Sequence, residues 1–292
     1  MSYEHPLAHI AGVEGLALLR AFNGEFGREF VEARLGELRR LLDDESLVGA
    51  ATVVDQVDAV AGYAAWASAY DEPGNALIDL EEPVVRRVFD DLPVGTVLDA
   101  ACGTGRHAEF LHGAGHRVLG VDDSPEMLAR ARERVPGAEL RRGRLDALPV
   151  ADGSVDAVVC ALALTHVESL APVLAEFARV LRPGGRLVIS DLHHEMVLRN
   201  SVPPVVIDGR PGRLPAYRHY PSDYLAPALA CGFELRGCDE PRWSSAGGVA
   251  SAGPGPWETW PWSLAAMVPE AVRAANRGVP AVVVWRFALD GS

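Results

Sequence analysis

The stretch that decides the fold is Val97-Leu98-Asp99-Ala100-Ala101-Cys102-Gly103-Thr104-Gly105-Arg106-His107-Ala108. It joins a short β-rich run to a helical pattern through a glycine-rich turn. Gly103 and Gly105 let the backbone approach a ligand closely and leave the amides at the helix N-terminus exposed to it. The spacing Gly103-x-Gly105-x-x-Ala108 fits the dinucleotide fingerprint, and Asp122 follows Gly103 by 19 residues, where a ribose-binding acid belongs. The turn therefore predicts a site for a ligand that contains adenosine.

Outward from this turn, β-rich runs alternate with helical stretches, which is typical of a parallel sheet with crossover helices. We predict strands at 96–100, 117–122, 138–143, 155–164, 186–191, 233–239 and 281–289. We expect helices at 105–112, after a Ser124 cap with Pro125 at the first position, at 170–181 and at 222–231. A Pro- and Arg-rich loop should connect the fifth strand to about Pro215. The predicted fold class is α/β, a Rossmann-like, doubly wound sheet of seven mostly parallel strands with an antiparallel last strand.

The first 70 residues have a different pattern, which we interpret as all-helical. Apolar residues recur every three to five positions between Gly15 and Leu42, with glycines dividing the pattern into two helices. Thr52 and Asp55 resemble a capping box, which predicts a further helix reaching about Tyr70.

The predicted domain organisation follows from this change of pattern. Residues 1–70 form an N-terminal helical segment that serves as a lid, a cap or a dimerisation element, so a homodimer is one possibility. Residues 71–292 form the Rossmann-like domain. It carries an insertion at 241–279, rich in Trp, Gly and Pro, which is either a lid over an apolar acceptor or a satellite cluster or subunit interface.

Composition excludes several classes of protein. All 27 basic residues are arginine, so the Schiff-base lysine of pyridoxal phosphate enzymes and the P-loop lysine are both missing. The net charge of -13 disfavours a nucleic-acid partner. No apolar run approaches the ~18 residues of a membrane span, and the first residues show no signal-peptide pattern, so we expect no membrane partner and a cytoplasmic protein. The four cysteines form no CxxC pair and are expected to be reduced and mostly buried.

Four segments in order discriminate between the ligands that the glycine turn permits: LDAACGTG (98–105), GVDDSPEML (120–128), LPVADGSVDAVV (148–159) and LAEFARVLRPGGRLVIS (174–190). In these segments the sequence resembles the class I S-adenosylmethionine-dependent methyltransferase superfamily, especially the branch that methylates ubiquinone and menaquinone precursors. The resemblance covers roughly residues 70–192. It implies S-adenosyl-L-methionine as cofactor, S-adenosyl-L-homocysteine as product and a small-molecule acceptor.

The resemblance also implies the roles of the cofactor-binding residues. The glycine loop packs against the amino-acid end of the cofactor and Asp99 orients that end. Asp122 accepts hydrogen bonds from the ribose hydroxyls, because one carboxylate offers two acceptors to a cis-diol. Met127 lies near the adenine ring, and Tyr70 belongs to a segment that closes over the cofactor. The alternative role of Asp122 is a helix cap, and the alternative role of both Met127 and Tyr70 is core packing. The predicted set is Tyr70, Asp99, Ala101, Cys102, Gly103, Thr104, Gly105, Asp122, Asp123, Met127, Leu145, Asp146 and Ala161.

The adenine region departs from the family pattern. The family usually has Gly-Asp at the end of its third strand, where the acid accepts the amine of adenine, but this chain has Gly143-Arg144-Leu145-Asp146. Arginine cannot accept a hydrogen bond. In an extended segment, residues 144 and 146 lie on the same face. We therefore hypothesise that Asp146 takes the acceptor role and that Leu145 contributes only its backbone amide.

The candidate bases are histidines that follow strands. Methyl transfer needs the nucleophile aligned and water excluded, and a base can remove its proton. His166 follows the fourth strand and His193 the fifth, and an ordinary histidine pKa near ~6.5 suits a base at neutral pH. Either residue could instead only shape the pocket, and no metal site is expected. The sequence does not determine whether the nucleophilic atom of the acceptor is oxygen, nitrogen or carbon. An NAD(P)-dependent oxidoreductase and a cofactor-binding relative that does not methylate are the alternatives.

Overall fold

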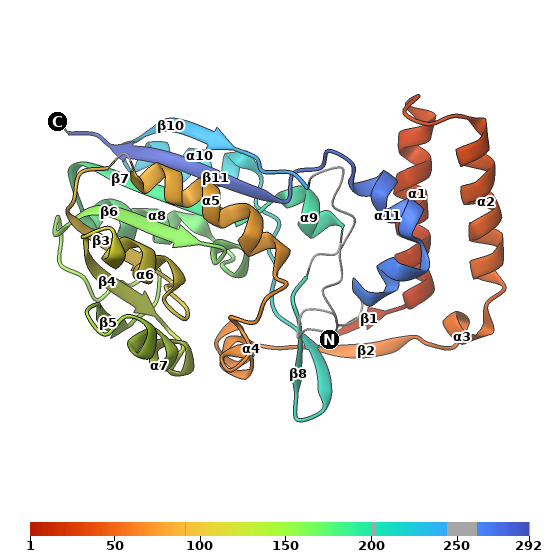
Figure 1. The fold of residues 1–292 in the computed structure, drawn as a ribbon, viewed down its shortest axis with the longest axis horizontal. Helices are drawn as coiled ribbons and strands as arrows, with labels where there is room; N and C mark the ends of the chain where they lie inside the picture. The colour runs from red at the N-terminus through yellow and green to blue at the C-terminus, as the bar shows by residue number, and fades with distance from the viewer. Residues whose placement is uncertain (91, 200–201, 244–261, 292) are drawn as a thin grey trace.

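The computed structural model describes residues 1–90, 92–199, 202–243 and 262–291. Figure 1 shows a twisted sheet flanked by helices on one side of the molecule and a lobe of helices on the other. Short strands run between the two parts. The Trp-rich stretch at 244–261, with Trp257 and Trp260, lies outside the described residues.

The large sheet has seven strands. Their order is β10 (Phe233–Asp239), β11 (Val282–Leu289), β7 (Leu181–Leu192), β6 (Val155–Ala161), β3 (Thr96–Ala100), β4 (Arg117–Asp122) and β5 (Glu139–Arg142). Strands β3 to β7 are parallel to one another, and β11 is antiparallel to both of its neighbours, β7 and β10. The predicted fold class is confirmed. The order reverses between β3 and β6, and ligands of such sheets bind at the carboxyl ends of the strands beside that reversal.

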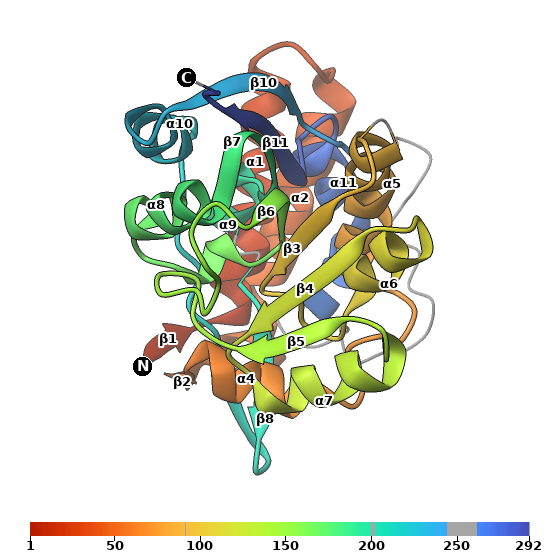
Figure 2. The ribbon, with the colours of Figure 1, turned by 90° about the vertical axis from the view of Figure 1, so that its left-hand side faces the viewer.

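Helices cover both faces of this sheet. Figure 2 shows α8 (Leu170–Val180) and α10 (Pro221–Ala230) on one face, and α5 (Ala76–Asp90) and α6 (Arg106–Gly113) on the other, with α7 (Pro125–Arg134) beside β5. Because both faces are covered, central strands are apolar along their length; Leu98 and Val158 are fully buried. Phe177 fills the core under α8, and Phe89 fills the core under α5.

The helical lobe combines the N-terminal helices with a segment that precedes the last strand of the large sheet. It contains α1 (Pro6–Phe22), α2 (Arg28–Leu42), α3 (Glu45–Val48), η2 (Trp262–Met267) and α11 (Pro269–Asn276). Ile10, Leu41 and Val268 share its core. Arg34 pairs with the buried Glu14 at 3.1 Å and with Glu270 at 2.7 Å. Residues near the C-terminus therefore help to fix the position of the N-terminal helices.

A four-stranded sheet corrects two predictions. Its order is β1 (Ser2–Glu4), β2 (Thr52–Gln56), β9 (Arg210–Arg213) and β8 (Pro204–Ile207). The first 70 residues are thus not all-helical, and residues 192–215 are not only loop, since α9 (His194–Leu198) and a hairpin lie there. Asp208 and Gly209 form the hairpin turn with φ of 50° and 75°, conformations that an Asp-Gly pair tolerates.

The prediction of a helix that begins with a capping box at Thr52 is also wrong. Thr52 begins β2 because the β-branched run that follows pairs with β1 and β9. The helix begins later, as α4 (Ala59–Trp66), and Asp58 caps it through Oδ1, which accepts from the amides of Val60 and Ala61. Two smaller differences are that β6 ends at Ala161 rather than at 164, and that β7 begins at Leu181 rather than at 186.

Two sequence expectations concern the cysteines and the membrane. All four cysteines are free, as expected, but of cysteines predicted to be mostly buried only Cys102 and Cys160 are; Cys231 is half-buried and Cys238 is exposed. Within the described ranges, no helix combines the length and the apolar character that crossing a bilayer requires.

Candidate functional site

The glycine loop after β3 shapes the centre of the site. Ala101, Gly103 and Gly105 have φ of 59°, 53° and 85°, so three left-handed residues turn the chain sharply into α6. At Gly105 a Cβ would lie 3.2 Å from Cβ of Ala131, so glycine allows the loop to pack against α7. At Gly103 a Cβ would meet nothing within 4 Å. The loop therefore leaves open space at Gly103, as a loop that receives a ligand must.

Asp122 ends β4 beside this loop. Its Oδ2 accepts from the Gly103 amide at 2.8 Å and its Oδ1 accepts from the Ser124 amide at 2.9 Å. Burial raises the pKa of Asp122. Ser124, not Asp122, caps α7, since Oγ of Ser124 accepts from the Met127 amide at 3.2 Å. Each carboxylate oxygen keeps a further lone pair, so both can still accept from a diol.

Asp99 is a buried acceptor behind the loop. Its side chain is 1% exposed, and Oδ2 has no hydrogen-bond partner in the described part of the chain. Burial raises the pKa of Asp99 to about 6, although His107 and Arg106 favour the charged form. An unpartnered buried carboxylate oxygen fits a cationic group of a ligand, such as the ammonium of S-adenosylmethionine.

Replacing Asp99 by asparagine should stabilise the fold at high pH. A carboxyl with a folded pKa near 6 and an unfolded pKa near ~3.9 binds more protons when folded, so its ionisation costs stability as pH rises through that window. We expect Asp99→Asn to raise the free energy of unfolding by about 1–3 kcal/mol at pH 8 and by much less at pH 4.5. Urea denaturation at both values measures the difference. Asp152→Asn, whose side chain is 80% exposed, is the control, and an equal effect at both pH values would refute the assignment.

The segment after α4 is tied to the glycine loop. Oγ1 of Thr104 donates to Oδ1 of Asp71 at 2.8 Å, and Arg134 pairs with Oδ2 of Asp71 at 2.9 Å. Arg134 also donates to Oγ1 of Thr104 at 2.9 Å. Tyr70 precedes this contact, and burial raises its pKa to about 12. The predicted closing segment therefore reaches the loop through Asp71.

The adenine-region residues do not form the extended segment on which the prediction for Asp146 rested, because Leu145 and Asp146 lie in a turn between the bridge residues Arg144 and Ala147. Across this turn Arg144 and Asp146 form a two-point pair, with N–O distances of 2.9 and 2.8 Å. The hydrogen bond from Arg144 lowers the pKa of Asp146, whose side chain is 38% exposed. Leu145 packs against the core of the large sheet.

The other predicted cofactor residues surround the strand ends. Asp123 pairs with Arg142 at 3.3 Å, and the Met127 side chain is 1% exposed. Ala161 is the last residue of β6, and the Cys102 amide donates to the Val121 carbonyl at 3.0 Å, which holds the loop against β4.

His166 forms a pair that the sequence did not indicate. It lies in η1 (Leu164–His166), after β6, and its Nδ1 is 2.6 Å from the Pro215 carbonyl, which can only accept. Nδ1 therefore carries the proton, and Nε2 accepts from Oη of Tyr63 at 2.9 Å. Tyr63 comes from α4, and its ring lies 5.9 Å from that of Tyr70. The imidazole is thus held in one tautomer with its basic nitrogen facing Tyr63.

The titration of His166 is a measurable consequence. Burial lowers its pKa, and the Pro215 carbonyl opposes this only in part. We expect His166 to titrate below the ordinary histidine value, with Nδ1 protonated in the neutral form, in ¹H–¹⁵N NMR spectra assigned with His166→Gln. A pKa above the ordinary value near ~6.5 would contradict this environment.

His193 has a different setting. It caps α9, with Nδ1 accepting from the Glu195 amide at 3.2 Å, and its Nε2 lies 3.3 Å from Glu240. Burial and the adjacent His194 lower its pKa. Since Nδ1 is already an acceptor, Nε2 donates to Glu240. Both nitrogens of His193 are therefore engaged in fixing local structure.

A buried charge cluster lies behind the glycine loop. Glu81 of α5 is fully buried and contacts His107 at 3.0 Å, Arg106 at 2.9 Å and the Ser190 hydroxyl at 2.7 Å. These contacts overcome the desolvation of Glu81 and lower its pKa to about 2. The cluster holds the start of α6 against α5 and β7. Asp191 near the end of β7 is also buried, with its pKa raised to about 6 by that burial.

Within the described ranges, no three His, Cys, Asp or Glu side chains gather as metal ligands.

An open parallel sheet with a glycine loop after its first parallel strand and an acid at the end of the next belongs to the Rossmann-like class, which binds adenosine-containing ligands. Within that class, residues 98–189 match the family described as a methyltransferase domain. Residues 98–189 thus form a methyltransferase domain, in agreement with the class I S-adenosylmethionine-dependent superfamily that the sequence motifs indicated.

Curated relatives match the same part of the chain. A protein of Mycolicibacterium smegmatis described as a probable S-adenosylmethionine-dependent methyltransferase is 39% identical over 109 residues, which is 37% of this chain and 42% of the relative. The demethylmenaquinone methyltransferase of Renibacterium salmoninarum is 40% identical over 103 residues, 35% of this chain and 44% of the relative. The chain therefore spans less than half the length of these relatives.

A solved structure supports the fold alone. A Haloferax volcanii structure, a complex between the Trm112 methyltransferase activator and a putative methyltransferase, superposes with a TM-score of 0.57 at 22% identity. The superposition covers 82% of this chain and all of that one.

Proposed function

We propose that the protein transfers a methyl group from S-adenosylmethionine to an oxygen, nitrogen or carbon nucleophile of a small, partly apolar acceptor. Two observations carry this proposal: the open space at Gly103, and the unpartnered buried oxygen of Asp99 in the strand that leads into the same loop. A buried carboxylate oxygen without a partner calls for an explanation, and a cationic group of a bound ligand supplies one. The four ordered sequence segments and the matching family model favour this donor over NAD(P).

Four of the predicted residues then have roles that their surroundings support. Asp99 receives the ammonium of the donor, Asp122 receives the ribose hydroxyls, and Gly103 and Gly105 allow the loop to approach it. The bound cofactor supplies an activated methyl group on sulfur. The chain supplies alignment, exclusion of water and a path for the proton of the nucleophile.

The proton path favours His166 over His193. The basic nitrogen of His166 accepts from Tyr63, so a proton given to the Tyr63 oxygen can be passed on to His166 as the tyrosine releases its own. The Pro215 carbonyl stabilises the resulting imidazolium through Nδ1. In His193 the acceptor nitrogen already serves as the helix cap.

The adenine acceptor gives a binding prediction. We expect Asp146→Ala to weaken binding of S-adenosylhomocysteine three- to tenfold, about 0.7–1.4 kcal/mol, because the adenine amine loses its acceptor. Arg144→Ala should leave the affinity within twofold, since Arg144 orients Asp146 but contributes no acceptor. Calorimetric titration measures both. Unchanged affinity in Asp146→Ala would remove Asp146 from the site.

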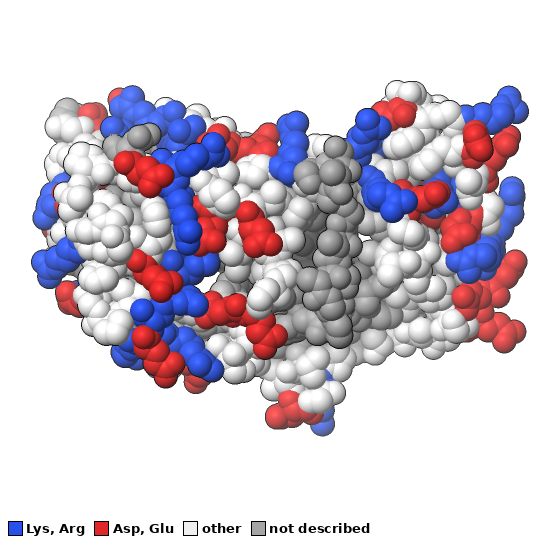
Figure 3. All heavy atoms as spheres, viewed as in Figure 1, with Lys and Arg blue, Asp and Glu red and all other residues white. Residues whose placement is uncertain are grey.

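The surface and composition bear on partners and location. On the face drawn in Figure 3, acidic and basic side chains are interspersed, so that face offers no single-signed field to steer a polyphosphate. We infer a bacterial enzyme of secondary metabolism, because an arginine-only, Ala- and Gly-rich composition is typical of GC-rich bacterial genomes, and a cytoplasmic location remains part of the proposal.

A transfer assay tests the proposal. The protein is incubated with methyl-labelled S-adenosylmethionine and a panel of phenols, hydroxyquinones, amines and aromatic acids. Label transfer above that of a Gly103→Asp variant supports a methyltransferase. Tight donor binding without transfer to any panel member would favour the cofactor-binding relative that does not methylate.

A further inference from the structure

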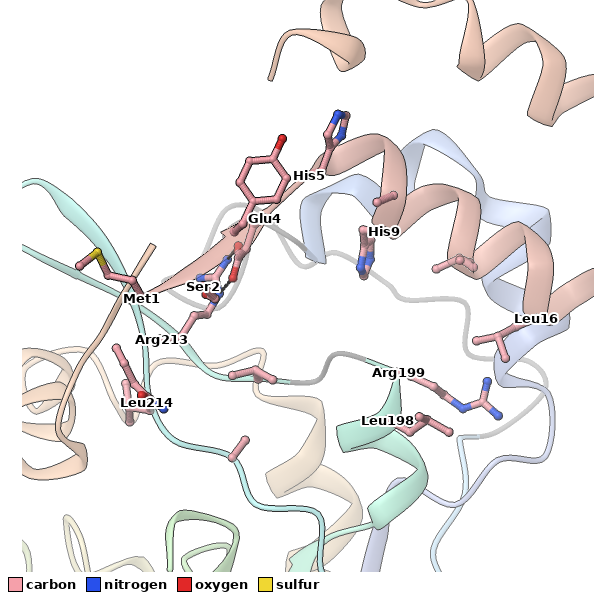
Figure 4. Close-up of a pocket in the computed structure, with 17 residues that line it drawn as sticks. Met1, Ser2, Glu4, His5, His9, Leu16, Leu198, Arg199, Arg213 and Leu214 are labelled. Carbon is pink, nitrogen blue, oxygen red and sulfur yellow. Dashed lines mark hydrogen bonds and ion pairs between the residues drawn. The ribbon is translucent and has the colours of Figure 1, made fainter. Parts of the chain in front are cut away.

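A cleft separates the helical lobe from the sheet domain. Its volume is about 760 Å³, within the usual range of small-molecule sites. Figure 4 shows α1 on one wall, with His9 and Leu16, and the end of α9 on the opposite wall, with Leu198 and Arg199. Arg213 and Leu214 also line it, together with the first residues of the chain.

The lining is mostly apolar and contains little unbalanced charge. Leu16, Leu198 and Leu214 contribute apolar surface. The carboxylate of Glu4 is neutralised by Arg213 through two contacts of 2.8 and 2.6 Å. Burial lowers the pKa of His9, which favours its neutral form.

Two buried nitrogens in the lining lack partners. Nδ1 of His5 and Nε of Arg199 make no hydrogen bond in the described part of the chain. The other Arg199 nitrogens donate to the Ala275 carbonyl at 3.2 Å and to Glu195 at 3.2 Å. Because Arg199 Nε can only donate, it calls for an acceptor oxygen on whatever fills the cleft. An apolar molecule that carries a carbonyl or carboxylate would match both the apolar lining and the free donor of Arg199.

One wall of the cleft also contacts His166, which lies past the carboxyl end of β6. Leu214 and Ala216 line the cleft, and the carbonyl of Pro215 between them binds Nδ1 of His166. Leu214 also packs against Gly62, where a Cβ would lie 2.5 Å from its side chain, and Tyr63 follows Gly62 in α4. An occupant of the cleft therefore rests against the segment that positions the Tyr63 and His166 pair.

We propose that this cleft binds the methyl acceptor, an aromatic or similarly apolar small molecule with a carboxylate or carbonyl group directed to Arg199. The assignment of this ligand as the acceptor rests on the proposed function. The apolar body lies between α1 and α9, and the wall at 214–216 places it beside the strand ends.

A fluorescence titration with 1-anilinonaphthalene-8-sulfonate, an apolar aromatic anion, tests the cleft in the presence of S-adenosylhomocysteine. We expect saturable binding at one site in the wild type and at least tenfold weaker binding in Leu16→Trp and Leu198→Trp, which fill the cleft from opposite walls. Leu19→Trp, on the same helix but 63% exposed and outside the cleft, should bind as the wild type does. Circular dichroism melts identify any variant that fails to fold.

The outcomes separate this inference from the proposed function. Absence of saturable binding, or equal affinity in both cleft variants and the wild type, overturns the cleft site whatever the donor result. Probe binding that behaves as expected, in a protein that does not bind S-adenosylhomocysteine, overturns the proposed function and the acceptor assignment while the cleft remains a ligand site. If the transfer assay finds an acceptor, it must displace the probe; transfer without displacement overturns the acceptor assignment.

Discussion

Replacing Gly103 by alanine is expected to weaken the binding of S-adenosylhomocysteine at least tenfold, about 1.4 kcal/mol, while the protein still folds. A Cβ at Gly103 meets no atom of the chain within 4 Å, so nothing in the fold opposes it sterically. It would instead enter the space assigned to the amino-acid end of the cofactor. The left-handed backbone at φ 53° adds a conformational cost of about 1–2 kcal/mol to folding.

Gly24 provides a matched control for this variant. It lies between α1 and α2, has φ of 87° and would also place a Cβ in open space. Gly24→Ala should therefore lose comparable stability and keep full affinity. Isothermal titration and urea denaturation of both variants separate the two effects. If Gly103→Ala binds as tightly as Gly24→Ala, the open space at the loop is not the donor site.

Replacing Glu81 by alanine is expected to lower the free energy of unfolding by about 3–5 kcal/mol at pH 7. The substitution leaves His107 and Arg106 without the carboxylate that compensates them, and the Ser190 hydroxyl without its acceptor. Glu133→Ala, at a 74% exposed site paired with Arg130, should cost less than about 1 kcal/mol. Guanidinium denaturation measures both variants.

The pH dependence of this difference has a defined direction. A carboxyl whose folded pKa is lowered to about 2 stabilises the fold above its unfolded value near ~4.3 and loses that contribution as pH falls towards 2. The gap between wild type and Glu81→Ala should therefore be constant from pH 5 to 8 and shrink below pH 4. A gap that stays constant down to pH 2.5, or one smaller than about 1 kcal/mol at pH 7, would show that the cluster is not held together by the charge of Glu81.

The large sheet could be predicted from sequence because its strands alternate with helical stretches and each central strand is apolar on both faces. The strands at 96–100, 117–122 and 233–239 have the predicted bounds. The small sheet could not be predicted from sequence, since β2 pairs in parallel with β9, more than 150 positions away along the chain. Thr52 satisfied a local capping pattern, and the distant pairing overrode it. The hairpin at Asp208-Gly209 did carry a readable turn signal.

The residues of the candidate site also fall into those that a local sequence pattern predicts and those that only long-range contacts bring together. Gly103, Asp99 and Asp122 belong to a local motif whose spacing specifies their positions, so their places at the strand ends could be expected. Tyr63 contacts His166 across 103 positions, and Glu81 contacts Ser190 across 109, and neither contact leaves a local pattern. The cleft was equally unpredictable, because it exists only where the helical lobe meets α9 and residues 213–216.

Calorimetric titration of the wild-type protein with S-adenosylhomocysteine and, separately, with NAD tests the central claim most directly. The site described here predicts saturable one-to-one binding of S-adenosylhomocysteine and no detectable binding of NAD. Tight NAD binding without a response to S-adenosylhomocysteine would contradict it.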